Sequence, residues 1–214
     1  MITLIRTALR LVPPPRRPTA ALARCLATCL GGAAVATSWG GSAFGQAVSV
    51  MGDPGAVACY HAAERGDGSR DALADCDRAL DLGGLDRRNR AATHLNRGIV
   101  RAARGDLQAA LSDYAEARRI MPGLPESDMG EGNVLFLMGD FDSALAAYET
   151  ALDNGLRARH AANFNRGLTY EQMGRFDESE AAYREAAALA PEWRLPLAHI
   201  ERLDDKRAAA ARRP

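Results

Sequence analysis

The chain has 214 residues, of which 47% are hydrophobic and 25% charged, with a formal net charge of zero. This length is enough for one or two domains, and the composition is typical of a soluble globular protein. The charge is uneven: residues 1–47 hold five arginines and no acid, which leaves 22 basic against 27 acidic residues in the remainder. An acidic body without a basic stripe argues against nucleic-acid binding, because phosphate contacts need clustered Lys and Arg.

Residues 1–47 show the order of features of a secretory signal peptide. Arginines come first, an apolar stretch rich in Ala, Leu and Gly follows over roughly residues 19–38, and small residues then appear at "SAFGQA". We expect cleavage after Gly45 or Ala47 and export to the periplasm. Two alternatives stay open. The "LATC" before Leu30 is similar to a lipoprotein box that would anchor the protein at the membrane, and an arginine-rich leader without acids also suits an organellar transit peptide.

The remainder of the chain repeats with a period of 34 to 35 residues. The repeat is anchored on a glycine, with a second glycine seven residues later, a small residue after twelve, a tyrosine after sixteen and an alanine after nineteen. The members of the three clear copies are Gly98, Gly105, Ala110, Tyr114 and Ala117; Gly132, Gly139, Ala144, Tyr148 and Ala151; and Gly167, Gly174, Ser179, Tyr183 and Ala186. Five shared positions in three copies indicate a repeat protein.

This pattern resembles the tetratricopeptide repeat, a pair of helices joined by a turn. The resemblance implies an all-α, right-handed superhelical solenoid in which the first glycine and the small residue let two helices approach and the tyrosine fills the remaining gap. It covers residues 53–193 as four repeats, at about 53–86, 91–124, 125–158 and 160–193. A proline 24 residues after the first glycine, at Pro122 and Pro191, would end the second helix.

The sequence departs from the family pattern just before the first glycine, where arginine or glutamate replaces the usual leucine. "LNRG" and "FNRG" place Arg97 and Arg166 there. Arg97 either reaches an acid on the second helix, such as Asp113, or buries its stem and leaves the guanidinium in water.

The first repeat, residues 53–86, lacks the glycine and the tyrosine and has Tyr60 and Cys76 in their places. In the helical hairpin that the resemblance implies, Cys59 and Cys76 are equally far from the centre of the turn. Facing Cα atoms of two packed helices lie about 4–5 Å apart, which suits a disulfide. We therefore expect a Cys59–Cys76 bond in an exported protein. The alternatives are two reduced buried cysteines, or a metal or redox site with His61 and Asp75, which lacks the usual CxxC spacing.

One stripe of the first helices is the predicted partner-binding groove. Residues one after each glycine, and four before those, share a helix face that points away from the second helix. Together with positions one turn further on, the predicted groove residues are Val57, His61, Leu95, Ile99, Met129, Asn133, Phe136, Leu137, Phe164, Leu168 and Glu171. Phe136 and Met129 are the expected central anchors for an apolar or amphipathic helical ligand. The alternative is that these residues pack against the neighbouring helix and expose little.

After the last repeat, residues 194–211 predict a capping helix with one apolar stripe, under which Trp193 packs. The sequence contains no catalytic motif and no phosphate-binding glycine loop. We therefore expect no enzyme activity and no cofactor. The predicted function is an exported scaffold or adaptor that binds a protein or peptide. The alternative is a cell-envelope protein that associates with itself, since the sequence does not fix the oligomeric state.

Overall fold

The computed structural model describes residues 46–212, apart from the side chains of residues 209–211, so the predicted signal peptide lies almost wholly outside the described residues. Over this range the chain forms nine α-helices and no strand. Their bounds are α2 Pro54–Glu64, α3 Arg70–Asp81, α4 Arg87–Arg104, α5 Leu107–Ile120, α6 Pro125–Met138, α7 Phe141–Asp153, α8 Arg159–Gln172, α9 Phe176–Leu189 and α10 Leu195–Ala211.

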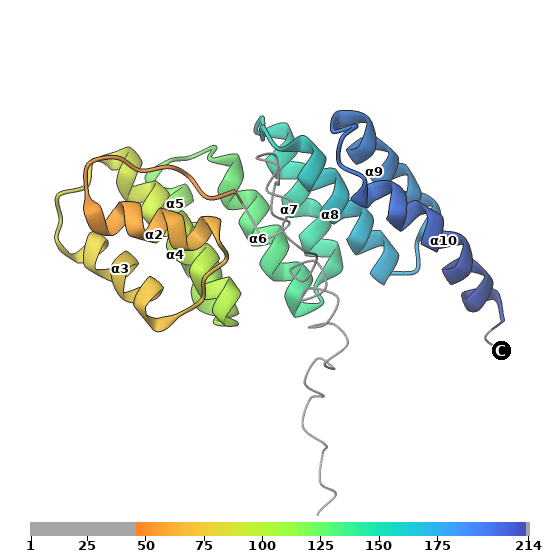
Figure 1. Cartoon of the computed structure of the whole chain (residues 1–214), viewed down its shortest axis with the longest axis horizontal. Helices are drawn as coiled ribbons and strands as arrows, with labels where there is room; N and C mark the ends of the chain where they lie inside the picture. The colour runs from red at the N-terminus through yellow and green to blue at the C-terminus, as the bar shows by residue number, and fades with distance from the viewer. Residues whose placement is uncertain (1–45, 213–214) are drawn as a thin grey trace, which may run out of the picture. The chain divides into compact units, whose positions relative to one another are not determined.

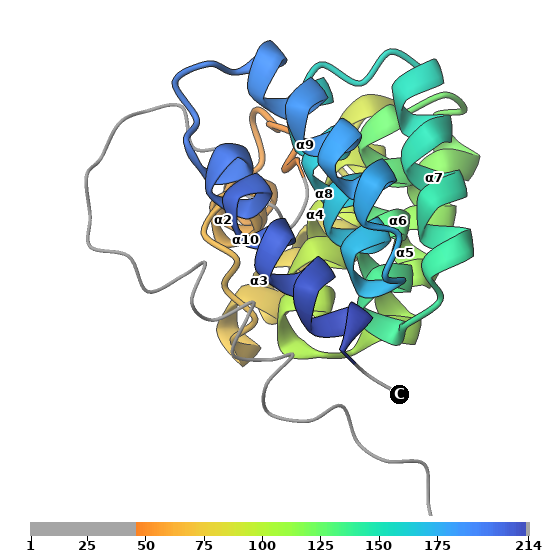
Figure 2. The same cartoon turned by 90° about the vertical axis from the view of Figure 1, so that its right-hand side faces the viewer.

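The helices pack as four consecutive hairpins, α2–α3, α4–α5, α6–α7 and α8–α9, and α10 packs on α9 (Figures 1 and 2). We call α2, α4, α6 and α8 the A helices and α3, α5, α7 and α9 the B helices. Each A helix also contacts the A helix of the next hairpin, and the B helices α3, α5 and α7 each contact the A helix that follows them. The architecture is an all-α repeat solenoid, as the sequence predicts.

The turns within the hairpins follow the sequence pattern. Gly105 and Gly139 end α4 and α6 with φ of 91° and 83°, in the left-handed region that glycine adopts without a steric penalty. Side chains cap the starts of α2, α3, α4 and α7; in the first two, Asp53 accepts from the backbone N–H of Ala56, and Ser69 accepts from that of Ala72. Local sequence therefore fixes where these hairpins bend.

A glycine on the A helix faces a tyrosine on the B helix in repeats two to four. A Cβ atom on Gly98 would lie 2.6 Å from Cε1 of Tyr114, and a Cβ on Gly132 would lie 2.5 Å from Cε1 of Tyr148. Gly167 and Tyr183 have the same relation. All three tyrosines are buried, with at most 1% of their surface exposed. The ring thus packs directly on the helix backbone, in a space that no side chain on the A helix could share.

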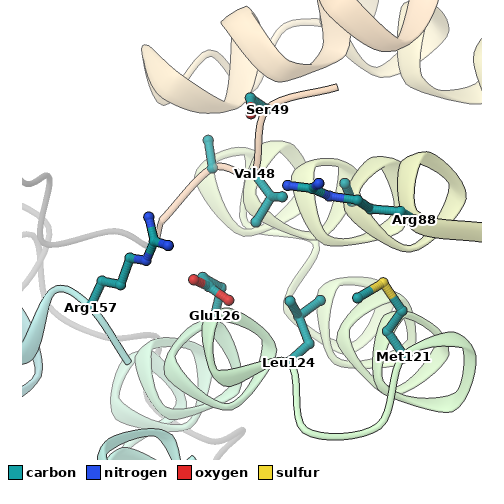
Figure 3. Close-up of a pocket in the computed structure, with 9 residues that line it drawn as sticks. Val48, Ser49, Arg88, Met121, Leu124, Glu126 and Arg157 are labelled. Carbon is teal, nitrogen blue, oxygen red and sulfur yellow. The ribbon is translucent and has the colours of Figure 1, made fainter. Parts of the chain in front are cut away.

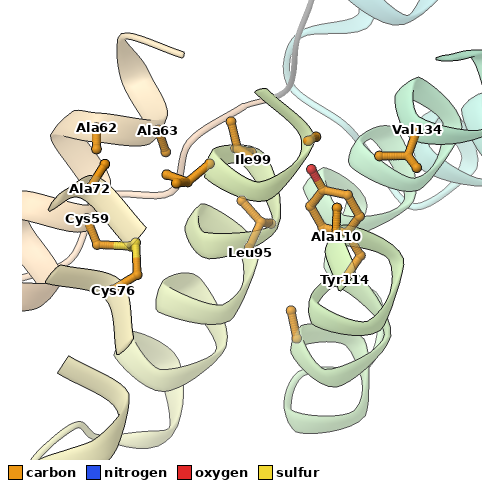
Figure 4. Close-up of a cluster of buried hydrophobic side chains, with 13 residues drawn as sticks. Cys59, Ala62, Ala63, Ala72, Cys76, Leu95, Ile99, Ala110, Tyr114 and Val134 are labelled. Atoms are coloured by element: carbon orange, nitrogen blue, oxygen red, sulfur yellow. A yellow bond between two sulfur atoms is a disulfide. The ribbon is translucent and has the colours of Figure 1, made fainter. Parts of the chain in front are cut away.

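The first hairpin is joined by a covalent bond instead. Cys59 of α2 and Cys76 of α3 form a disulfide with a Cα–Cα distance of 4.8 Å, within the range expected from the packing of two helices (Figure 4). Both residues are fully buried in a cluster with Leu95 and Ile99 of α4. The disulfide therefore occupies the space between the helices that a tyrosine occupies in the other three repeats.

The last hairpin is covered by α10. Leu203 of α10 is fully buried against Phe164, Tyr183 and Ala186. Trp193, in the linker before α10, packs on Phe164 with ring centroids 4.8 Å apart. The helix thus covers the apolar end of the stack, as the sequence predicts for a capping element.

Candidate functional site

Four of the predicted groove residues are buried in the core, and their assignment to an open groove is therefore wrong. Leu95, Met129 and Phe164 are 0% exposed and Ile99 is 2% exposed. Leu95 and Ile99 pack with the disulfide, and Phe164 packs against Tyr183, 5.4 Å between ring centroids. These side chains are buried because the A helix packs against its own B helix and against the neighbouring hairpins. Met129, a predicted central anchor, is unavailable to a ligand in this structure.

Other members of the predicted groove remain accessible to different degrees. His61 is exposed and lies 3.3 Å from Glu64. The half-buried apolar members are Val57, Phe136, Leu137 and Leu168. Phe136 leans on Phe141 with ring centroids 5.7 Å apart, so one side of it is covered by α7. Phe136 thus keeps part of its surface free and is still a candidate contact residue.

Two polar residues of the predicted groove are committed to internal hydrogen bonds. Asn133 is 7% exposed, and its Oδ1 accepts from the hydroxyl of Tyr148 at 3.0 Å and from Nδ2 of Asn165 at 2.7 Å. The Glu171 side chain is 6% exposed and contacts α9 and α10, away from open solvent. Neither residue is therefore an open groove contact.

Glu171 instead joins the last hairpin to the capping helix. Its carboxylate accepts from the hydroxyl of Tyr183 at 2.5 Å, lies 3.3 Å from Nδ1 of His199 and pairs with Lys206, the only lysine in the chain. Burial alone would raise the pKa of Glu171, but these three hydrogen-bonding partners outweigh it and lower the pKa to about 2. The carboxylate is therefore charged at neutral pH and stabilises the docking of α10.

Arg97 forms an ion pair, which decides between its two predicted arrangements. Its guanidinium lies 2.8 Å from Asp113, which also binds Arg101 at 2.8 Å and His94 at 3.3 Å. Asp113 is 2% exposed. Burial would raise the pKa of this carboxyl, but the hydrogen bonds from His94 and Arg97 and the nearby positive charges lower it. The cluster holds α4 against α5 and has the satisfied hydrogen bonding of a structural network.

A segment that sequence reasoning missed lies on the A-helix side of the second repeat. Residues 46–51, which we call the strap, have no helical structure and run back over α4 (Figure 1). The side-chain amide of Asn96 holds the strap by two bonds to one residue: Oδ1 accepts from the N–H of Val48 at 2.9 Å, and Nδ2 donates to its C=O at 2.8 Å. Nδ2 of Asn89 donates to the carbonyl of Met51 at 3.2 Å. Asn96 is 0% exposed, so its amide is used entirely within the protein.

The side chains of the strap alternate between protein and solvent, as in any extended chain. Val48 is half-buried, Ser49 is exposed, Val50 is 6% exposed and Met51 is 81% exposed. Val50 packs with Ala56, Ala79, Leu85 and Ala92, which places it between the first hairpin and α4. The contact between Val48 and Asn96 joins residues 48 positions apart and leaves no periodic signal in the sequence. Asn96 is visible there only as part of the "LNRG" motif.

A pocket of about 550 Å³ lies beside the strap (Figure 3). Its apolar lining comes from the strap itself and from Ala92, Met121 and Leu124. In the view of Figure 3, Arg88 and Arg157 lie on either side of the strap, and Glu126 lies near Leu124. The pocket thus combines an apolar floor with charged groups of both signs.

Two findings on residues 46–212 concern metal ligands and membrane-spanning helices. Within residues 46–212, no group of three or more His, Cys, Asp or Glu side chains is arranged to hold a metal ion. Cys59 and Cys76, proposed as alternative metal or redox ligands, are bonded to each other. No helix in the same range is long and apolar enough to cross a membrane.

The described helices form an all-α solenoid of helical hairpins, and comparisons with known proteins show which repeat it is similar to. The sequence profile of the tetratricopeptide repeat matches residues 129–192. A crystal structure of MamA superposes with a TM-score of 0.58 at 19% identity, over 74% of this chain and 87% of that one. MamA from Desulfovibrio magneticus RS-1 gives 0.58 at 20% identity, over 74% and 88%.

A tetratricopeptide repeat protein from Parabacteroides merdae superposes with a TM-score of 0.53 at 21% identity, over 69% of this chain and 58% of that one. No curated protein sequence matches the chain. At these identities the structural likeness concerns the fold. The repeat profile thus identifies tetratricopeptide repeats over residues 129–192, and the structural likeness shows that the described chain has the fold of such repeat proteins.

Proposed function

We propose that this chain is a protein-interaction scaffold that binds an apolar or amphipathic segment of a partner protein on the A-helix side of the stack. The observation that supports this most strongly is the strap, since this surface already holds a length of non-helical polypeptide through its main chain. Repeat proteins of this family are generally scaffolds without enzymatic activity, and stacked hairpins provide an extended surface for partners.

Half-buried apolar residues of α6 and α8 supply the rest of the proposed binding site. Phe136, Leu137 and Leu168 combine apolar contact area with partial exposure, which favours a partner segment with an apolar side. Burial of Met129 removes one of the two anchors expected from the sequence. The proposed contact area therefore consists of the half-buried residues and the strap surface.

The test is cross-linked capture from the native source with a matched pair of variants. Phe136→Asp places a charge on the proposed surface, and Leu189→Asp places the same charge on α9, where Leu189 is 49% exposed. We expect Phe136→Asp to lose at least tenfold of the captured partner, while Leu189→Asp keeps it. Circular dichroism and thermal melting must show both variants folded. Undiminished capture by a folded Phe136→Asp protein would place the partner elsewhere.

We also propose that the protein is exported and works in the periplasm. The arginine-first leader with small residues at "SAFGQA" and a disulfide in the mature part both favour an oxidising compartment. N-terminal sequencing of protein from its native source should begin near Gln46 or Val48. A mature protein that still carries Arg16 and Arg17 would contradict export by this route.

A further inference from the structure

We propose that the strap, residues 46–51, is an internal occupant of the partner site, and that an extended segment of the partner binds by displacing it. This proposal rests on the proposed function and adds to it a ligand chemistry and a form of regulation. The strap is the inhibitory state of the scaffold, and its departure opens the surface of α4 around Asn96.

The contacts of the strap are of a kind that another polypeptide could make. Among residues 46–212, the side chain of Asn96 bonds to the backbone N–H and C=O of Val48, a pair of groups that every residue except proline offers. Once the strap leaves, both polar atoms of the Asn96 side chain can pair with water or with the backbone of another chain. Asn96 thus offers an incoming extended segment the same two main-chain bonds that it gives the strap.

The first hairpin is also held together by contacts that do not involve the strap. The first turn of α2 is capped by Asp53, which follows the strap in the chain. The disulfide Cys59–Cys76 joins α2 to α3 independently. Between the strap and this cap lies Gly52, with φ of 92° and open space around its Cα, which allows the chain to swing there. We infer that the cap and the disulfide keep the hairpin folded when the strap leaves and Val50 loses its contacts with Ala56 and Ala79.

The present occupant indicates the chemistry of the incoming segment. Its side chains are uncharged, its backbone is extended, and the aliphatic side chains of Val48 and Val50, two residues apart, point toward the protein. The pocket beside Val48 is only partly used by a valine, because about 550 Å³ remains next to it. A partner segment with a larger aliphatic residue in that place would bury more apolar surface than the strap and so compete with it.

The test uses full-length protein and a defined probe, the fluorescein-labelled peptide QAVSVMG with blocked ends, which copies residues 46–52. The opened variant, designed to release the strap, is Val48→Pro with Val50→Asp. Proline removes the N–H that donates to Oδ1 of Asn96, and the charge of the aspartate disfavours burial in the apolar site of Val50. The control is Ser49→Pro with Met51→Asp, the same changes at the two exposed positions of the strap. Circular dichroism must show all proteins folded.

By fluorescence anisotropy, we expect the opened variant to bind the probe at least tenfold more tightly than the wild type and the control. Adding Asn96→Ala to the opened variant should weaken probe binding at least tenfold. The proposal is wrong if the folded opened variant does not bind the probe, or if all proteins bind it equally. If the opened variant dimerises as its concentration rises and the dimer does not bind the probe, a second copy of the chain occupies the site. That result would also contradict the proposal.

Hydrogen exchange of the wild type gives a second measurement that needs no variant. If the strap opens by itself, the amide of Val48 exchanges at least tenfold faster than the buried amides of α4. Exchange at the same slow rate as α4 would mean that the strap is an integral part of the fold. Neither experiment involves the native partner, so failure of partner capture and failure of strap exchange remain distinguishable.

Discussion

The first and last hairpins of the stack each have a neighbouring hairpin on one side only. They are stabilised by different kinds of interaction. The first hairpin is held by the buried disulfide Cys59–Cys76. The last hairpin is held by α10 and by the carboxylate of Glu171, which binds partners on α9 and α10. Reductant breaks the disulfide, but acid does not. Acid weakens the ionic network by protonating the carboxylate, whereas reductant leaves it unchanged. The difference shows that the two ends can be destabilised independently.

Removing the disulfide should produce the largest effect, and only at the first hairpin. For a sequence separation of 17 residues, the chain-entropy estimate is about 3 kcal/mol. Cys59→Ala with Cys76→Ala should lose about this much stability in urea unfolding and should be insensitive to dithiothreitol. Oxidised wild type should lose a similar amount when reduced, and its intact mass should rise by about two daltons. Equal stability of reduced and oxidised wild type would remove the proposed role of this bond.

The middle of the stack provides a reference for both ends, since the gap between α6 and α7 is filled by the ring of Tyr148 and holds no disulfide. Gly132→Ala would place a Cβ 2.5 Å from Tyr148 and should cost about 1–3 kcal/mol through overpacking. The matched control is Gly84→Ala, which has open space around it and should change stability by less than about 1 kcal/mol. Urea unfolding of both variants measures the difference. A Gly132→Ala protein as stable as the control would mean that the ring shifts freely.

Acid should selectively loosen the C-terminal end. The pKa of Glu171 is about 2 in the folded state and 4.5 ordinarily, so between these values the unfolded chain takes up a proton that the folded chain does not. The contribution of the Glu171 carboxylate to the free energy of unfolding is thus fully present above about pH 5 and is lost as the pH falls toward 2. Allowing for partial solvent screening, the loss is on the order of 1–2 kcal/mol.

The variant Glu171→Gln isolates this contribution. It should be less stable than the wild type at pH 7 and should show a weaker loss of stability between pH 5 and pH 2. Glu192→Gln, at an exposed position, should follow the wild type across the whole range. Urea unfolding at a series of pH values measures both variants, and parallel curves for Glu171→Gln and the wild type would contradict the assignment.

The smallest expected effect compares two tyrosines with different hydroxyl environments. The hydroxyl of Tyr148 donates to Asn133 at 3.0 Å, while the buried hydroxyl of Tyr114 has no partner among residues 46–212. Tyr148→Phe should cost about 1 kcal/mol, and Tyr114→Phe should be neutral or slightly stabilising. Thermal or urea unfolding distinguishes them. If both variants lost the same amount, the hydroxyl of Tyr114 would have to be hydrogen-bonded in solution.

The sequence by itself determined the features that depend on local periodicity. Glycines at fixed spacing located the turns, the tyrosines located the interhelix gaps, and the symmetric positions of Cys59 and Cys76 placed them within bonding distance, because hairpin geometry follows from helix geometry alone. The capping helix followed from its apolar stripe.

Only the tertiary structure decided which residues of the predicted groove are accessible. Met129 and Phe136 lie on the same predicted stripe, yet Met129 is fully buried and Phe136 is half-exposed, because exposure depends on how closely the neighbouring hairpins pack. The strap also belongs to the tertiary structure: its bond to Asn96 joins positions 48 residues apart and leaves no repeating pattern. Long-range contacts of a short irregular segment are set by the surface available to it, which exists only once the hairpins have stacked.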